Sequence, residues 1–207
     1  MCGADMTSLE DTTKRHYMKP LDPDYVAEMS KDGFDPHLDL AKHAGVITQD
    51  DIDKHNSGER SLKALRKNYK VVNYSATYGV GAAKLARETG MDKGEAQKLL
   101  DAFWNRNWSV QEVANRLQVK DRRGAMWVRN PVSGFWYSLR SDKDRFSTLN
   151  QGTGVFCFDS WVRNCREFGL KTIGQFHDEV IVLVKDGDQD KTENLMKTSI
   201  QNLNDKL

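Results

Sequence analysis

Cysteine is scarce in this sequence, and the few that are present form no recognisable pattern. The three cysteines are Cys2, Cys157 and Cys165, and no two of them have Cys-x-x-Cys spacing. A disulfide framework needs paired cysteines, and a zinc site needs closely spaced thiolates. The sequence therefore argues against both and predicts a reducing, intracellular location.

The sequence also lacks a long apolar run and an excess of charge of either sign. Its longest apolar stretch is Val180–Val184, whereas a membrane-spanning helix needs about 20 apolar residues. The N-terminus has no basic segment followed by an apolar stretch, so we predict no signal peptide and no membrane association. Lys plus Arg number 31 and Asp plus Glu number 30. Any nucleic-acid surface must therefore come from local clustering of cations.

The remaining composition is that of a folded protein with one or two domains. Of its 207 residues, 38% are hydrophobic and 29% are charged, which is enough to form a core. The apolar periodicity, and the Gly and Pro residues that interrupt it, predict an α+β fold. Helices are expected over residues 8–18, 61–78, 92–117, 143–168 and 192–203, and β-hairpins over 126–137 and 171–184. Residues 24–60 are predicted to be rich in loops, with short helical stretches at 25–29 and 38–43.

One predicted helix carries two cations and two aromatic residues on the same face. Arg66, Lys70, Tyr74 and Tyr78 follow one another at i, i+4 spacing. A guanidinium fork and an ammonium group suit a triphosphate, while aromatic rings offer a flat surface to a base and a sugar. The pattern also fits a second interpretation, in which the tyrosines lie in the core and the cations solvate the helix.

Acidic residues occur at two further positions suited to metal binding. His177-Asp178-Glu179 separates two β-rich runs, so a hairpin would present Asp178 at its tip, where a carboxylate can bind Mg²⁺. Asp5 ends a short extended segment, and Glu10 lies one turn into the following helix. Taken singly, the turn could be merely solvated, and Glu10 could merely compensate the helix dipole.

Together these segments resemble the three motifs of the family A DNA polymerases, the group related to bacterial DNA polymerase I and its phage counterparts. Asp5 to Glu10 resembles motif A, Arg66 to Gly79 resembles motif B, and His177-Asp178-Glu179 resembles motif C, in the family's order. Asp35-Pro36-His37 and Gln151-Gly152-Thr153 resemble two smaller family segments. Tyr74 resembles the phage members of the family, which have Tyr where many bacterial members have Phe. The resemblance implies that the protein is located in the cytoplasm, which is that of the host if a phage encodes it.

The resemblance implies a right-hand polymerase in which mainly helical fingers are inserted into a partial palm with a small antiparallel sheet. Residues 1–30 and 139–207 would form palm parts with motifs A and C, and residues 31–138 would form the fingers with motif B. Since the sequence starts at motif A, no thumb or exonuclease is expected. This suggests one piece of a split polymerase, completed by a second polypeptide that supplies the thumb and the rest of the palm.

The resemblance also implies the chemistry, which is nucleotidyl transfer from a dNTP to a primer 3′-hydroxyl on template DNA. Asp5, Asp178 and the backbone carbonyl of Met6 would hold two Mg²⁺ ions. Arg66 and Lys70 would bind the triphosphate, and Lys70 would also be the catalytic proton donor to the leaving group.

The remaining motif residues would contact the sugar, the template and the primer. Glu10 and Tyr74 would form a steric gate against ribonucleotides, and the Tyr74 hydroxyl would permit incorporation of dideoxynucleotides. Tyr78 would stack on the template base, with Gly79 allowing a sharp turn. Gln151 and His177 would contact the primer terminus or the minor groove near it.

Three positions depart from the family pattern, and two alternatives remain open. Lys143 and Ser147 occupy positions where the family commonly has Arg and Asn, and Thr12 replaces the Arg that usually follows Glu10. One alternative is a non-catalytic DNA- or nucleotide-binding fragment. The other is part of a phage-type RNA polymerase, although that group usually has Met at the position of Tyr74.

Overall fold

The computed structural model describes residues 1–205, which form two compact units. The carboxylate unit comprises Met1–Thr13, Asn130–Phe135 and the chain from Leu149 onward. The helical unit comprises Lys14–Arg129 and Trp136–Thr148. The described residues are mainly helical, with two small antiparallel sheets, which confirms the predicted α+β class.

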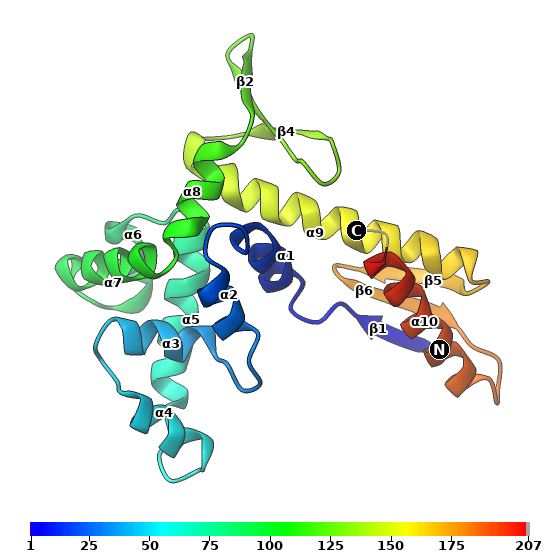
Figure 1. Cartoon of the computed structure of the whole chain (residues 1–207), viewed down its shortest axis with the longest axis horizontal. Helices are drawn as coiled ribbons and strands as arrows, with labels where there is room; N and C mark the ends of the chain where they lie inside the picture. Colours follow the sequence, from blue (N-terminus) through cyan, green and yellow to red (C-terminus); the bar gives the residue numbers. More distant parts are fainter. Residues whose placement is uncertain (206–207) are drawn as a thin grey trace. The chain divides into compact units, whose positions relative to one another are not determined.

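The carboxylate unit is built on a three-stranded sheet with the order β1-β6-β5 (Figure 1). Its elements are β1 (Cys2–Asp5), the start of α1 (Leu9–Met18), α9 (Arg145–Glu167) from Leu149 onward, β5 (Lys171–Phe176), β6 (Glu179–Leu183) and α10 (Gln189–Asn204). The β-branched Val180 and Val182 alternate toward one face of the sheet and are fully buried. They pack with Trp161 of α9 and Met196 of α10 in one core. The hairpin predicted over residues 171–184 is confirmed.

The helical unit consists of short helices followed by a second three-stranded sheet, with the order β2-β3-β4. Its helices, besides the end of α1 and the start of α9, are α2 (Pro23–Met29), α3 (Pro36–His43), α4 (Gln49–Asn56), α5 (Lys63–Thr77), α6 (Ala82–Thr89), α7 (Lys93–Arg106), α8 (Trp108–Arg116) and a single 3-10 turn over Asp142–Asp144. The sheet contains β2 (Val119–Arg122), β3 (Ala125–Arg129) and β4 (Trp136–Leu139). Buried apolar residues such as Leu85 and Phe103 form the core between the helices.

The short helical stretches predicted at 25–29 and 38–43 are confirmed by α2 and α3, but the region 24–60 is less rich in loops than predicted, because it also contains α4. Two Asp-Pro pairs, Asp22-Pro23 and Asp35-Pro36, are helix starts. Asp22 and Asp35 are N-caps whose carboxylates accept backbone N–H groups, and the prolines that follow occupy the first helical turn, where an amide N–H is not needed. Helices α4 and α6 were also not predicted.

The single helix predicted over residues 92–117 is likewise wrong, because it breaks at Asn107 into α7 and α8. The buried Asn107 side chain donates to the carbonyl oxygen of Phe103 (3.0 Å) and accepts from Lys14 Nζ (2.6 Å). An amide that bonds locally in this way competes with the helical pattern. The hairpin predicted over 126–137 is part of a larger sheet, because β2 pairs with β3.

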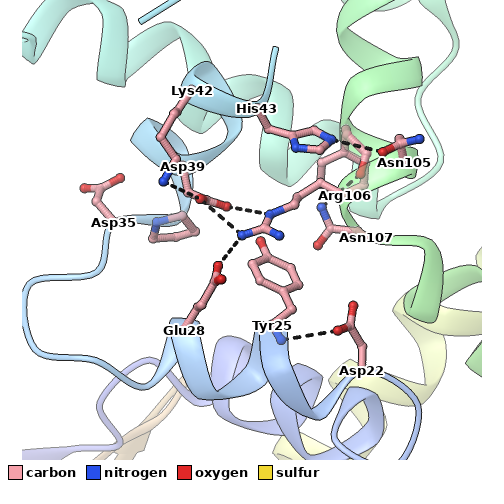
Figure 2. Close-up of polar contacts among 12 residues, drawn as sticks. Asp22, Tyr25, Glu28, Asp35, Asp39, Lys42, His43, Asn105, Arg106 and Asn107 are labelled. Carbon is pink, nitrogen blue, oxygen red and sulfur yellow. Dashed lines mark hydrogen bonds and ion pairs between the residues drawn. The ribbon is translucent and has the colours of Figure 1, made fainter. Parts of the chain in front are cut away.

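A polar network centred on Arg106 joins α2, α3 and α7 of the helical unit (Figure 2). Arg106 donates from Nη2 to Glu28 (2.5 Å) and from Nε to Asp39 (3.0 Å), and its guanidinium lies 3.9 Å from the ring centre of Tyr25. Burial works against the charged guanidinium, but Asp39 and Glu28 outweigh it and raise the pKa of Arg106. The network thus fixes α3, whose first turn contributes to the site described below.

No helix within residues 1–205 combines the length and the apolar character needed to cross a bilayer.

Candidate active site

Strand pairing in the carboxylate unit brings the two predicted metal-binding aspartates to one end of the sheet. Asp5, the last residue of β1, pairs with Glu179, the first residue of β6. The backbone N–H of Met6 then donates to the carbonyl oxygen of Asp178 at 3.1 Å. The segments that resemble motifs A and C are therefore joined by the backbone itself, which limits how far the two aspartates can move apart.

The β5–β6 turn consists of His177 and Asp178, as predicted for the hairpin tip. His177 has a φ of 60°, a region that L-residues rarely occupy. Its Nδ1 lies 2.6 Å from Asp178 Oδ1, and this hydrogen bond is the main cause that raises the pKa of His177. The charges of Asp178, Glu10 and Asp5 act in the same direction, which shows that a negative field surrounds the turn.

Four of the predicted site residues line one cavity of about 310 Å³ in the carboxylate unit. These residues are Glu10, Gln151, His177 and Asp178. The other lining residues are Leu9, Asn150, Gly154, Val155 and Phe158, so that the lining contains carboxylates but no Lys or Arg. Such a cavity favours cations over anions.

Asn150 positions this cavity and was not predicted from the sequence. Its Nδ2 donates to the backbone carbonyl of Glu10 (3.0 Å), and its Oδ1 accepts from the Thr13 hydroxyl (2.7 Å). These bonds fasten the first turns of α1 to α9, and Asn150 itself is 5% exposed. The sequence feature that could have identified Asn150 is its polar amide, which directly precedes Gln151 on the buried side of a long helix.

In the helical unit, α5 presents the predicted cationic and aromatic face to the outside. Tyr74 and Tyr78 are 42% and 39% exposed, whereas Tyr69, Val72 and Ala76 form the buried face. Lys70 Nζ lies 5.7 Å from the ring centre of Tyr74. The interpretation of both tyrosines as core residues is therefore wrong. The helical repeat of 3.6 residues is sufficient to place the two sets of side chains on different faces of α5.

The first turn of α3 adds two residues to this face. Arg66 Nε donates to Asp35 Oδ2, and the His37 ring centre lies 6.0 Å from that of Tyr74. Asn73, which was not predicted, holds His37 through a contact between Nδ2 and the ring Nδ1 at 3.2 Å. These contacts fix the Arg66 fork and the Tyr74 ring from one side.

Asp35 is held in its charged form by these same contacts. Burial acts to raise its pKa, but the hydrogen bonds from Arg66 and from the backbone N–H groups of Leu38 and His37 outweigh it. The pKa of Asp35 is therefore lowered. A permanent carboxylate at this position keeps the Arg66 guanidinium oriented at neutral pH.

Gly79 occupies a position that only glycine fits without strain. Its φ is 70°, and a Cβ built there would lie 3.3 Å from Lys143 Cδ. Lys143 Nζ also approaches the Gly79 carbonyl oxygen at 3.4 Å. In this structure Lys143, where the family commonly has Arg, supports the turn after α5.

The donors at the end of the carboxylate sheet fit Mg²⁺ that arrives together with a nucleotide. Within residues 1–205, no group of three or more His, Cys, Asp or Glu side chains forms a ready-made metal cage. Mg²⁺ does not need one, because it usually takes one or two carboxylates and completes its shell with phosphate oxygens and water. Asp5, Asp178 and the Met6 carbonyl match that donor set, and no Lys or Arg lines the adjoining cavity.

The predicted partners of the steric gate belong to different units: Glu10 to the carboxylate unit and Tyr74 to the helical unit. The gate therefore stays a prediction. The same holds for the predicted boundaries at residues 30 and 138, since the compact units divide the chain after Thr13 and return to the first unit at Asn130 and Leu149.

Comparison with known proteins gives a match in structure only. No protein-family model matches the sequence, and no curated protein does. Among solved structures, the chain is similar to the POL domain of Pol1 from M. smegmatis in complex with DNA primer-template and dNTP, with a TM-score of 0.70 and 19% sequence identity. The match covers 97% of this chain and 36% of that chain. The chain therefore has the fold of part of a DNA polymerase domain.

Proposed function

We propose that this chain is the catalytic part of a template-directed DNA polymerase that transfers nucleotides from dNTPs to a primer 3′-hydroxyl. The observation that carries the proposal is the backbone bond from Met6 to Asp178, which brings together two carboxylates from opposite ends of the sequence. The exposed Lys70 and Tyr74 and the half-buried Arg66 on one face of α5 support it. The similar solved structure holds primer-template DNA and dNTP.

The residues of the carboxylate unit would bind the metals and the primer end. Asp5, Asp178 and the Met6 carbonyl would hold two Mg²⁺ ions, which when bound make the 3′-hydroxyl acidic and stabilise the departing pyrophosphate. Gln151 and His177, on the wall of the same cavity, would position the primer terminus. His177 would do so through a ring N–H.

The residues of α5 would bind the incoming nucleotide. Arg66 engages Asp35 through Nε, which leaves its terminal nitrogens oriented for a bidentate contact with the triphosphate. Lys70 would bind the triphosphate and donate a proton to the leaving pyrophosphate. Tyr74, held by His37, would exclude a 2′-hydroxyl together with Glu10, and Tyr78 would stack on the template base above the turn at Gly79.

We further propose that a second polypeptide completes the enzyme by supplying the thumb and the rest of the palm. Among the described residues, β1 pairs only with β6, so its outer edge offers unpaired backbone groups to another strand. A groove of about 570 Å³ lies beside it, lined partly by the apolar Leu9, Trp161, Met196 and Ile200. A partner strand added to β1 would place alternate apolar side chains in this groove. The match with the similar polymerase chain covers 36% of that chain.

Primer extension tests the function. The purified chain is incubated with primed template, Mg²⁺ and dNTPs, alone and with lysate from its native source. Extension by the wild type and its loss in Asp178→Asn support the proposal, with Asp186→Asn, an exposed loop carboxylate, as the matched control. Extension that needs the lysate supports a second polypeptide, and extension by the chain alone contradicts that part.

The same assay separates the alternatives. A non-catalytic fragment would bind primed template but never extend it, with or without lysate. A phage-type RNA polymerase would incorporate ribonucleotides in preference to deoxynucleotides.

A further inference from the structure

The second sheet has one face that gathers cations and aromatic rings. The pairings Lys120–Trp127, Arg122–Ala125 and Arg129–Trp136 place these residues on one side, because directly paired residues point to the same face. This side, named here the basic face, consists of Lys120, Arg122, Ala125, Trp127, Arg129, Trp136 and Ser138. It contains three cations and two tryptophans and no carboxylate.

The opposite face of the sheet is the one that packs. Val128 is fully buried and Leu139 is 6% exposed. Asp121, the acidic residue of β2, also points to this opposite side, and its Oδ1 accepts the backbone N–H of Gly124 at the hairpin turn. The sheet therefore packs through one face, and the basic face lies on the other side.

The cationic side chains of the basic face do not form salt bridges within the described residues. Lys120, Arg122 and Arg129 form no salt bridge with any carboxylate of residues 1–205, although many other cations of the chain do. Lys120 instead lies over the Trp136 ring, with Nζ 3.7 Å from the ring centre. Arg129 makes only a long contact to Gln118 at 3.5 Å. Three positive charges without a carboxylate partner thus lie beside two rings, in a protein whose net charge is only +1.

We propose that the basic face of β2-β3-β4 binds single-stranded nucleic acid. Cations spaced along a strand can follow a phosphate backbone, and tryptophan rings between them offer surfaces on which successive bases stack. An acidic peptide would use the cations but has no need of the rings, so the rings favour nucleic acid. Duplex DNA would bury its bases and leave the rings unused. The inference does not depend on the proposed polymerase function, because this binding needs neither metal nor dNTP.

Binding is measured by fluorescence anisotropy of a labelled oligothymidylate of about 12 nucleotides, within the range that one small domain occupies. The titrations contain EDTA and no dNTP, and are repeated at several salt concentrations. Arg122→Glu with Arg129→Glu is expected to weaken binding at least about tenfold and to make the salt dependence shallower by roughly 1.4 in log–log slope. Both side chains are exposed, so folding should be unaffected.

A second variant tests the rings separately. Trp127→Ala is expected to weaken binding by roughly five- to a hundredfold without changing the salt slope, because stacking releases no counterions. Circular dichroism confirms that this half-buried position still folds. The matched control is Lys93→Glu with Lys98→Glu, which makes the same charge change at two exposed positions of α7.

Two outcomes would overturn the proposal. Equal weakening by the control pair would mean that only net charge matters. A poly-glutamate peptide that displaces the oligonucleotide at equal charge, with no effect of Trp127→Ala on either ligand, would identify the face as a docking surface for acidic peptides. If Asp178→Asn loses primer extension but still binds the oligothymidylate, the polymerase proposal and the proposal for the basic face can be tested independently.

Discussion

The backbone N–H of Met6 donates to the carbonyl oxygen of Asp178, and this 3.1 Å bond is the link between the first strand and the hairpin tip. Asp5 directly precedes Met6 in the sequence, and Asp178 itself supplies the carbonyl oxygen. The main chain therefore holds both aspartates near each other without any contact between their side chains. Backbone placement of this kind suits metal ligands, because the main chain that carries them is already ordered before a metal binds.

Replacing Tyr74 with Phe should reveal the sugar contact. We expect the wild type to incorporate dideoxynucleotides readily, and Tyr74→Phe to discriminate against them by roughly tenfold or more, the size of one lost hydrogen bond. The ratio of dNTP to ddNTP incorporation in single-nucleotide extension measures this. Tyr69→Phe, on the buried face of the same helix, is the control. Strong discrimination by the wild type would contradict the assignment of Tyr74.

Replacing Gly79 with Ala should destabilise the turn after α5 for two reasons. A left-handed backbone costs an L-residue about 1–2 kcal/mol, and the new Cβ would crowd Lys143. Gly90→Ala is the matched control, since Gly90 has a φ of 74° but no neighbour within 4 Å of the new Cβ. Urea unfolding should show a greater loss for Gly79→Ala. Equal losses would mean that Lys143 moves aside without cost.

Replacing Arg106 with Met should remove the polar link between α2, α3 and α7. Asp39, whose side chain is 6% exposed, would lose its closest cation, with only Lys42 left at 3.8 Å. Removing one partner of a buried pair costs about 3–5 kcal/mol, and we expect the lower end of that range. Thermal and urea unfolding measure it. Arg116→Met, which breaks an exposed pair with Glu112, should change stability by less than about 1 kcal/mol.

The charge of Asp35 should make part of the stability depend on pH. Its pKa is lower in the folded chain than in the unfolded one, so its contribution is complete above the unfolded value of about 3.9 and is lost as pH falls through the folded value. Asp35→Asn keeps a good helix cap but removes the charge. The stability difference between wild type and variant should shrink toward acid pH in urea titrations. A difference that stays constant would mean that Arg66 does not stabilise the charged form.

Local patterns predicted the elements that carry the candidate site residues. The i, i+4 spacing of Arg66, Lys70 and Tyr74 placed them on the exposed face of α5, and the β-rich runs around His177 formed the expected hairpin. The same kind of reasoning was wrong where one side chain decided the outcome. The Asn107 amide breaks a helix that periodicity alone would continue, because its bonds to Phe103 and Lys14 compete with helical geometry.

Tertiary contacts decided the rest, because they join segments whose distance in the sequence hides their proximity. Strand pairing places Asp5 opposite Glu179, the Asn150 amide fastens the start of α1, and Asp35 orients Arg66. Each depends on how apolar faces of remote elements pack, and packing is a property of the whole core rather than of any short window. Helical and strand periodicities are local and can be identified in the sequence. The contacts that carboxylates, amides and cations make with residues distant in the sequence are visible only in the folded structure.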